Sequence, residues 1–177
     1  MLDSVGYFLS VSSLNYRKNF ITVLQAFSIF CDSNQYGNLY IVGDLKCDSF
    51  NGVYIQEYKS NDRIRFLGRV SDDELIEYYR NAVAFVFPSL YEGFGIPVIE
   101  AQACGCPVIS SNSSSLPEVL GESALTCNPL DVNRFAELMN DIFNDNDLRK
   151  KIIAKGYENV KRFSWNESAK KIVELIS

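Results

Sequence analysis

The chain has 177 residues, of which 47% are hydrophobic and 13% aromatic, a composition suited to one globular domain and too apolar for a disordered protein. Its 22 acidic and 17 basic residues give a net charge of −5 with no basic run, which argues against a nucleic-acid groove or an anionic membrane surface. Histidine is absent, so chemistry must rely on carboxylates, Lys, Arg or main-chain dipoles.

The cysteines form an odd set whose spacings match neither a CxxC zinc pair nor a regular disulfide framework: Cys31, Cys47, Cys104, Cys106 and Cys127. This pattern predicts reduced thiols and a cytoplasmic location. No stretch approaches the roughly 20 apolar residues of a membrane span, and an N-terminus with Asp3 and no basic segment does not resemble a signal peptide. We therefore expect no membrane span. Peripheral association with a membrane stays open for a full-length protein.

Apolar runs alternate with amphipathic segments along the first half of the chain. Phe20, Val23 and Phe27 recur at helical spacing, and Ser71 precedes Glu74 by three residues, the capping-box signature of a helix start. The predicted elements are strand 7–11, helix 18–31, strand 38–43, a loop around 47–51, a helical segment to about Tyr58, strand 63–68 and helix 71–82.

The second half repeats the alternation. The predicted elements are strand 84–88, helix 96–104, strand 107–110, a turn region at 116–120, strand 124–127 and helices 131–143, 145–162 and 164–176. Continuous apolar strands separated by helices indicate a parallel sheet covered on both faces. We therefore predict one α/β domain, a Rossmann-like doubly wound sheet of about six strands. The serine-rich stretch 110–115 is interpreted as a mobile loop.

In such a sheet, with strand order 3-2-1-4-5-6, ligands bind outside the carboxyl ends of strands 1 and 4. The loops expected at that point are 12–18 and 89–95. The second loop carries Gly93 and Gly95, which permit close approach of a ligand and positive φ angles. Pro97 follows in the first helical turn, and Gly105 suits the end of that helix. Free N–H groups of residues 94–96 then form a phosphate site. A plain structural turn explains the same glycines equally well.

The first loop ends in Arg17 and Lys18, which we place at the start of the first helix. Two fixed positive charges facing a helix N-terminus suit a pyrophosphate. The alternative is that both are solvated basic residues at a helix end. Their predicted meeting with the loop at 89–95 favours the ligand.

Two carboxylates complete the predicted site. Glu100 lies in a helix otherwise rich in Ile, Val, Ala and Cys, and a buried carboxylate there needs hydrogen-bond donors such as a ribose diol. Glu92, at the strand exit, faces whatever is attached beyond the second phosphate. An exposed Glu on a short helix is the competing interpretation of Glu100. The order ribose, diphosphate, hydroxylated group describes a nucleotide sugar.

The segment EGFGIPVIE at 92–100 resembles the E-x7-E signature of retaining, nucleotide-sugar-dependent glycosyltransferases with the GT-B fold, above all family 4 (glycosyltransferases group 1). SVSSLNYRKNF at 10–20 is similar to the first-strand loop of that family. Segments 65–111, 115–131 and 163–176 continue the likeness, so it covers essentially the whole chain.

The resemblance implies that residues 1–177 are the C-terminal, donor-binding half of a GT-B enzyme whose N-terminal acceptor domain is absent. It implies no metal and no cofactor, a UDP-, GDP- or ADP-sugar donor, and transfer with retention. The resemblance implies that Lys18 and Arg17 bind the phosphates and that Glu100 binds the ribose. It implies that Glu92 binds sugar hydroxyls and that main chain near Arg69 and Val70 contacts the base. The implied catalytic residues are Glu92 and Lys18, and the implied donor-binding residues are Arg17, Lys18, Arg69, Val70, Glu92, Gly93, Phe94, Gly95, Ile96 and Glu100.

Two departures from the family pattern matter. Ser12 and Ser13 stand where many members have Gly-Arg, so Arg17 is the candidate replacement for that phosphate-binding cation. Acceptor contacts and the usual histidine belong to the other half, so we expect this chain alone not to transfer sugar. The N-terminal half of the same protein is the expected partner, and a bacterial surface polysaccharide pathway is the expected setting by analogy.

Two other classes were weighed. A nicotinamide-dependent Rossmann enzyme needs G-x-G-x-x-G after the first strand, but residues 12–19 contain no glycine, and the chain also lacks a P-loop GK[ST]. A non-catalytic nucleotide- or sugar-binding module stays open, because binding and transfer use the same pocket.

Overall fold

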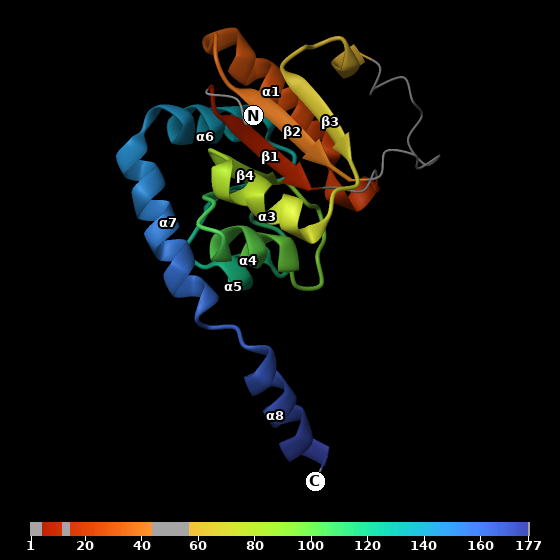
Figure 1. Ribbon diagram of the computed structural model, residues 1–177, viewed down its shortest axis with the longest axis vertical. Helices are drawn as coiled ribbons and strands as arrows, with labels where there is room; N and C mark the ends of the chain where they lie inside the picture. Colours follow the sequence, from red (N-terminus) through yellow and green to blue (C-terminus); the bar gives the residue numbers. More distant parts are fainter. Residues whose placement is uncertain (1–4, 12–14, 44–56, 177) are drawn as a thin grey trace.

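The computed structural model describes residues 5–11, 15–43 and 57–176, which form a six-stranded parallel sheet (Figure 1). The strand order is β3-β2-β1-β4-β5-β6, and all five neighbouring pairs are parallel. The predicted order is confirmed. The strands are β1 (Tyr7–Val11), β2 (Asn38–Val42), β3 (Ile64–Gly68), β4 (Ala84–Phe87), β5 (Val108–Ser111) and β6 (Leu125–Cys127).

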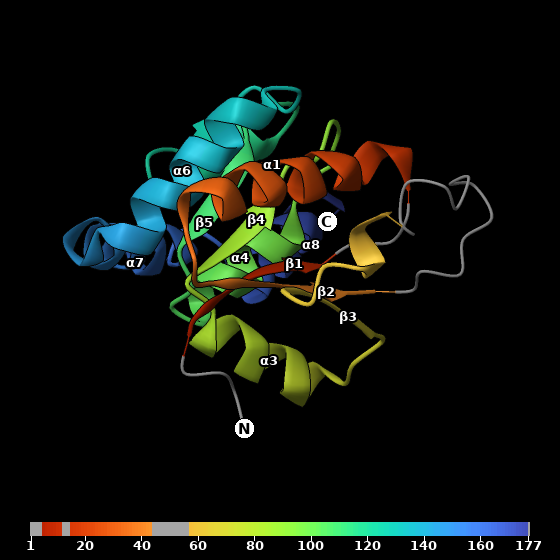
Figure 2. The same ribbon diagram turned by 90° about the horizontal axis from the view of Figure 1, so that it is seen from above.

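Helices cover both faces of the sheet, as Figure 2 shows from above. α1 and α6 pack on one face, whereas α3, α4 and α5 pack on the other. The doubly wound, Rossmann-like prediction is therefore confirmed. The helices are η1 (a 3₁₀ turn, Tyr16–Lys18), α1 (Phe20–Ser33), α3 (Asp72–Asn81), α4 (Ile96–Ala103), α5 (Leu116–Leu120), α6 (Val132–Asn144), α7 (Asn146–Val160) and α8 (Trp165–Ile176).

The central strand β1 supplies both cores by simple alternation. Phe8 belongs to the core beneath α1 and α6, whereas Tyr7 and Leu9 belong to the core beneath α3 and α4. Successive side chains of a strand point to opposite faces, so an uninterrupted apolar run fits a sheet covered twice. Each such aromatic, when fully buried, stabilises the fold by about 1.5–3 kcal/mol relative to exposure.

Local sequence signals fix one end of each of two helices. At the start of α3, Ser71 Oγ accepts a hydrogen bond from Glu74 N at 3.3 Å, and Glu74 Oε2 accepts one from Ser71 N at 2.8 Å. At the end of α4, Gly105 has φ +75°, and Cys106 N donates to Ala101 O at 2.9 Å. The predicted capping box and glycine stop are confirmed.

Three predictions about local structure were wrong. Arg17 and Lys18 do not begin the first helix but lie in η1, because Asn19 adopts a left-handed conformation (φ 50°) and starts α1 after them. The region 116–120 is the helix α5 and not a turn. The stretch 110–115 is not a detached loop, since Ser110 and Ser111 complete β5 and are fully buried.

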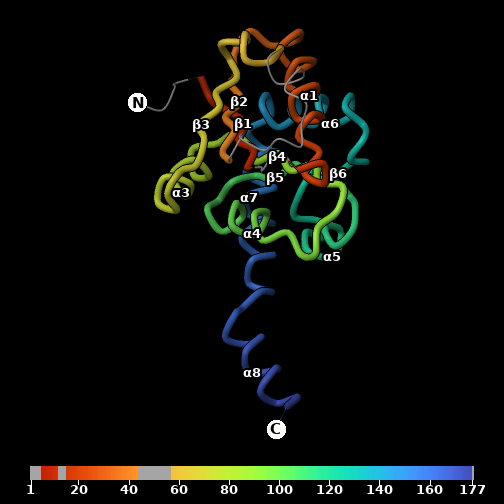
Figure 3. Tube along the Cα trace, turned by 90° about the vertical axis from the view of Figure 1, so that its right-hand side faces the viewer, coloured from red at the N-terminus to blue at the C-terminus, as the bar shows by residue number. Residues whose placement is uncertain are grey.

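The C-terminal part leaves the body of the domain. α7 packs against α4 and α6, whereas α8 projects away from the sheet (Figures 1 and 3). No residue of α8 is buried, and Trp165 and Leu175 are 81% and 86% exposed. A helix with an apolar stripe and no covering surface is typical of an interface.

Some predictions fall on residues that the structure does not describe: the loop around 47–51, Cys47, Ser12 and Ser13, and most of the helical segment before Tyr58, of which 57–59 are helical. Cys31, Cys104, Cys106 and Cys127 are free thiols. None of the described helices combines the length and hydrophobicity needed to cross a bilayer.

Candidate functional site

The loops that follow β1 and β4 meet at the carboxyl ends of these adjacent strands. Leu90 N donates to Arg17 O at 2.8 Å, and Asn19 Nδ2 donates to Pro88 O at 3.1 Å. Asn19 also donates to Pro129 O at 2.6 Å, so a buried amide ties three loops together. The two segments that topology predicted to converge are therefore in contact.

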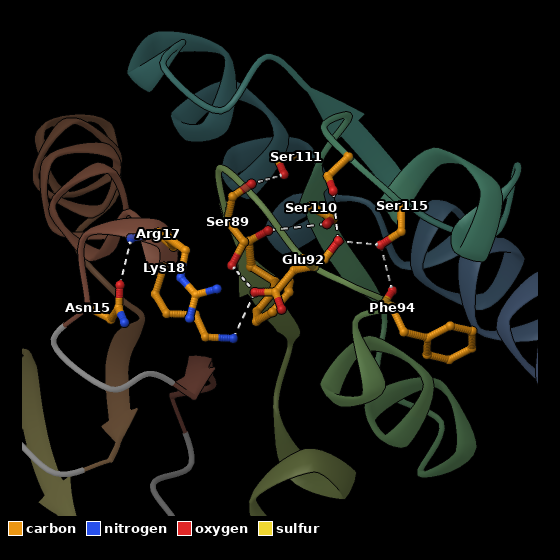
Figure 4. Close-up of polar contacts among 11 residues, drawn as sticks. Asn15, Arg17, Lys18, Ser89, Glu92, Phe94, Ser110, Ser111 and Ser115 are labelled. Carbon is orange, nitrogen blue, oxygen red and sulfur yellow. Dashed lines mark hydrogen bonds and ion pairs between the residues drawn. The ribbon is translucent and has the colours of Figure 1, made fainter.

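An ion pair spans the junction of these loops (Figure 4). Lys18 Nζ lies 2.7 Å from Glu92 Oε1, and Ser89 Oγ donates to the same oxygen at 2.7 Å. The ammonium group also lies 5.0 Å from the centre of the Phe87 ring. Both side chains are partly buried, with 25% and 14% exposure, so this pair is screened less than a surface pair.

Arg17 gives the junction a second positive charge. Its main chain is fixed on both sides, by the bond to Leu90 and by Asn15 Oδ1, which accepts from Arg17 N at 3.0 Å. Its side chain is exposed, and the part of the chain that the structure describes offers it no ion pair. The two positive charges of Arg17 and Lys18 exceed the one negative charge of Glu92, so the side chains alone make this junction electropositive.

The N-terminus of α4 adds main-chain donors. Gly95 is the N-cap with φ +99° and offers no side-chain cap, and Pro97 stands in the first turn. A Cβ on Gly95 would lie 2.8 Å from Leu116 Cδ2, whereas a Cβ on Gly93 would meet no atom of the described residues within 4 Å. Gly95 alone of these two uses a positive φ angle. Gly93 instead leaves open space at an N-terminus that favours anions.

Glu100 is exposed, so the prediction that it sits on a buried face of its helix was wrong. α4 buries Val98, Ala101 and Gln102 against the body of the domain, and the opposite face carries Glu100. Because nearly every position of this helix is apolar, the sequence pattern did not indicate which face turns inward. No ligand is needed to explain an exposed carboxylate.

Glu100 nevertheless lines a cavity of about 500 Å³ between α4, the connection from α7 to α8 and the first turns of α8. Phe94 and Phe163 pack edge to face there with ring centres 5.3 Å apart, and Trp165 completes the apolar wall. Partial burial, followed by repulsion from Asp72, raises the pKa of Glu100 above its ordinary value. Phe94 and Ile96 belong to this cavity, so the turn at 93–96 separates it from the Lys18–Glu92 pair.

Arg69 and Val70 follow β3 and lead into α3. Val70 packs partly buried against the core beneath α3 and α4, and Arg69 is exposed. α3 contacts α4, the helix that carries Glu100. The structure thus groups the predicted residues into two neighbouring sets, one around Lys18 and Glu92 and one around Glu100.

Sequence reasoning missed several serines at this site. Ser89 holds Glu92, and Ser114 and Ser115 reach its main chain from the loop after β5. The run at 110–115 was the available signal, but the partner of each hydroxyl lies about 20 residues away and cannot be read from local sequence. Among the described residues, no three His, Cys, Asp or Glu side chains gather at one point.

A family model described as Glycosyl transferases group 1 matches residues 3–159. The chain belongs to this family. The chain is 35% identical over 162 residues to O-antigen chain mannosyltransferase B of Escherichia coli, covering 90% of this chain and 42% of that protein. It is 34% identical over 140 residues to O-antigen chain mannosyltransferase RfbU of Salmonella typhimurium, covering 79% and 39%. It thus spans less than half of the length of these relatives.

Solved structures of glycosyltransferases share the fold of this chain. Sucrose-phosphate synthase from Thermosynechococcus elongatus matches with a TM-score of 0.84 and 30% identity, over 98% of this chain and 45% of that one. The C-terminal domain of a glycosyl transferase group 1 family protein from Francisella tularensis matches with a TM-score of 0.76. This match has 23% identity over 88% of this chain and 85% of that domain, and it supports the fold only. The domain is thus of the GT-B glycosyltransferase type.

Proposed function

We propose that residues 1–177 are the C-terminal, donor-binding domain of a retaining family 4 glycosyltransferase and bind a nucleoside-diphosphate sugar. The observation that carries this proposal is the contact of Lys18 with Glu92 beside the open N-terminus of α4. Cations, helix N–H groups and a carboxylate converge there, and a sugar diphosphate offers a complementary charge and hydroxyl pattern.

Each predicted residue then has a role in binding. The diphosphate draws Lys18 from Glu92 and lies between Lys18, Arg17 and the N–H groups at Gly93, Phe94, Gly95 and Ile96. Glu92, freed from the ammonium, accepts hydrogen bonds from the sugar. Glu100 binds the ribose hydroxyls from the neighbouring cavity, and main chain at Arg69 and Val70 borders the base.

The leaving diphosphate is stabilised without a metal in this proposal. Two side-chain cations and a helix N-terminus can neutralise most of the charge that develops as the glycosidic bond breaks. The acceptor attacks from the face of the leaving group, which retains the configuration at the anomeric carbon. Lys18 acts on the leaving group and Glu92 orients the sugar.

The proposed sugar is mannose. Two relatives that match at 34–35% identity carry the name O-antigen chain mannosyltransferase, which also supports a role in the synthesis of a bacterial surface polysaccharide. The proposed base is uracil, guanine or adenine. The proposed contacts to the base come from the main chain after β3, and such contacts do not select one of these three bases. Binding of each diphosphate decides among the three.

A second domain of the same full-length protein is the proposed partner. The relatives are more than twice as long as this chain, and we place the acceptor site of the full-length protein outside residues 1–177. In α8, Trp165, Ala169, Ile172, Val173 and Ile176 recur at spacings of three and four residues. This stripe is exposed and offers a surface for that domain.

Calorimetric titration of the chain with UDP, GDP and ADP, each with and without mannose attached, tests the proposal. One diphosphate should bind with a one-to-one stoichiometry, and attachment of mannose should tighten it. NAD serves as the control ligand from another Rossmann class. If none of the six diphosphates binds, the donor-domain proposal is wrong. Transfer is then measured with the full-length protein, and binding without transfer would support the non-catalytic module.

A further inference from the structure

Hydroxyl groups of the serine stretch 110–115 hold the loop after β4 along its length (Figure 4). Ser110 Oγ donates to Phe87 O at 3.2 Å, and Ser111 Oγ donates to Ser89 O. Further along, Ser114 Oγ donates to Glu92 O at 2.7 Å, and Ser115 Oγ lies between two carbonyl oxygens, 3.0 Å from Glu92 O and 3.1 Å from Phe94 O. Four serine side chains from the end of β5 and the loop after it thus contact four carbonyls of the end of β4 and the loop after it.

The contacts of Ser114 and Ser115 fix two peptide planes. In a trans peptide the C=O and N–H groups lie in one rigid plane and point in opposite directions. When Ser114 holds the carbonyl of Glu92, the N–H of Gly93 must point away from the serine loop. When Ser115 holds the carbonyl of Phe94, the N–H of Gly95 must do the same. Figure 4 shows Lys18 and Ser115 on opposite sides of Glu92, so the N–H of Gly93, which is opposed to the Glu92 carbonyl, points away from the serines.

Because residue 93 is a glycine, the orientation of the Glu92–Gly93 peptide depends on contacts from other parts of the chain. Gly93 has no side chain, and within the part of the chain that the structure describes a Cβ there would meet no atom within 4 Å. A hydroxyl that donates to the carbonyl also polarises the peptide group and strengthens its N–H as a donor.

The backbone of Ser114 supports a specific role. Its φ angle is 57°, in the left-handed region that non-glycine residues occupy at a cost. Its side chain is exposed and could bond to water, yet the strained backbone carries the hydroxyl to within 2.7 Å of Glu92 O. Glycine would suit the backbone better but would remove the hydroxyl.

We infer that Ser114 and Ser115 are positioning residues that aim the N–H groups of Gly93 and Gly95 at the diphosphate of the donor. This inference rests on the proposed function, because it presumes a diphosphate at the start of α4. The serines do not contact the donor. They set the direction of the two main-chain donors that do.

The test uses ¹⁵N-labelled chain and the nucleoside diphosphate that binds the wild type, together with the matching nucleoside. The variants are Ser114→Ala/Ser115→Ala, Ser114→Gly, Ser115→Thr and Ser113→Ala. Ser115→Thr keeps the hydroxyl, and Ser114→Gly removes the hydroxyl but relieves the backbone. Ser113→Ala is the matched control, because the described residues give its side chain no hydrogen bond.

In the wild type, the amide protons of Gly93 and Gly95 should shift downfield as the diphosphate binds. The double variant should lose most of this shift and bind the diphosphate about tenfold or more weakly, the effect expected when charge-assisted hydrogen bonds are misdirected. Its affinity for the nucleoside should stay within about twofold of the wild type, since that ligand does not use these N–H groups. Ser114→Gly should share the loss in part, and Ser115→Thr and Ser113→Ala should behave as the wild type.

Two results would overturn the inference alone. One is a double variant that binds the diphosphate as the wild type does, with the glycine shifts intact. The other is equal weakening of diphosphate and nucleoside, which indicates a general disturbance of the fold. A wild type that binds no diphosphate contradicts the proposed function itself, so the two failures are distinguishable.

Discussion

Lys18 Nζ and Glu92 Oε1 lie 2.7 Å apart, so the cation proposed to bind a diphosphate is held by the carboxylate proposed to bind the sugar. A donor must separate these two groups to engage both. The phosphates replace Glu92 as the partner of Lys18, and the sugar hydroxyls replace Lys18 as the partner of Glu92. A complete nucleotide sugar compensates both groups, whereas a bare diphosphate leaves Glu92 without its cation.

Replacement of the cation should weaken binding of every diphosphate. Lys18→Met keeps the length of the side chain and removes its charge. We expect the diphosphate to lose about 1.5–3 kcal/mol, the usual contribution of a hydrogen bond to a charged group. The fold should lose at most about 1 kcal/mol, because partly exposed ion pairs stabilise little. Calorimetry and thermal unfolding measure the two effects. Lys155→Met, on α7 and paired with Glu122, is the matched control.

Glu92→Gln should act in the opposite direction on the bare nucleotide. The variant removes a negative charge next to the phosphates and frees Lys18 in advance, so a bare diphosphate should bind as well as or better than in the wild type. The preference for the sugar-bearing form should disappear, because an amide is a weaker acceptor for sugar hydroxyls. Parallel titrations with both ligands give the ratio. Weaker binding of the bare diphosphate to this variant would contradict the assigned role.

The two glycines of the turn should respond differently to alanine. Gly93→Ala should fold as the wild type, since its methyl group meets no atom, but the methyl should obstruct a ligand that approaches the main chain. Gly95→Ala should destabilise the fold by about 1–2 kcal/mol, because φ is +99° and the methyl group would lie 2.8 Å from Leu116 Cδ2. Urea unfolding and ligand titration separate the effects. Loss of stability in Gly93→Ala would mean that the turn is packed more closely than described.

Stability should depend on pH through Glu100. Partial burial and Asp72 raise the pKa of this carboxyl, so the folded chain binds its proton more tightly than the unfolded chain does. The favourable contribution of the protonated form is complete below the unfolded pKa of about 4.3 and is lost as the pH rises through the folded pKa. Glu100→Gln should therefore match the wild type in acid and exceed its melting temperature at pH 7.

The same variant tests the ribose assignment. Glu100→Gln should weaken diphosphate binding at pH 7 by about 1–3 kcal/mol, because the ribose hydroxyls lose a charged acceptor. A higher melting temperature together with weaker binding would identify a residue that serves the ligand at the expense of the fold. Unchanged affinity for every nucleotide would remove Glu100 from the donor site.

The exposed stripe of α8 should matter only to the full-length protein. Ile172→Ser/Val173→Ser should leave the melting temperature of this chain unchanged, because these side chains are 59% and 61% exposed. In the full-length protein the same change should destabilise the contact between domains. Ile142→Ala, fully buried in α6, is the contrasting variant and should cost about 2–5 kcal/mol in both. Equal stability of the full-length variant and its parent would leave α8 without its proposed partner.

The sequence alone predicted the features that depend on local chemistry or on general topology. Ser71 with Glu74 and Gly105 marked helix ends, and alternating elements predicted the strand order that brings Lys18 to Glu92. The burial of Glu100 was mispredicted because α4 is apolar on most of its surface, and Phe94 and Ile96 are 42% and 46% exposed.

The contacts that sequence could not reach join residues distant along the chain. Asn19 ends η1 because its buried amide binds Pro88 and Pro129, and nothing in the neighbouring residues encodes that conformation. The serines after β5 similarly acquire their role only when β5 lies beside β4. Such positions require the fold before their chemistry can be interpreted.

The most direct test of the donor site is a crystal structure of this chain with the nucleoside diphosphate that it binds. The diphosphate should lie at the start of α4, within hydrogen-bond distance of Lys18 Nζ and of main-chain N–H groups between Gly93 and Ile96, with Lys18 withdrawn from Glu92. A diphosphate bound elsewhere, or bound with the Lys18–Glu92 pair intact, would contradict the account.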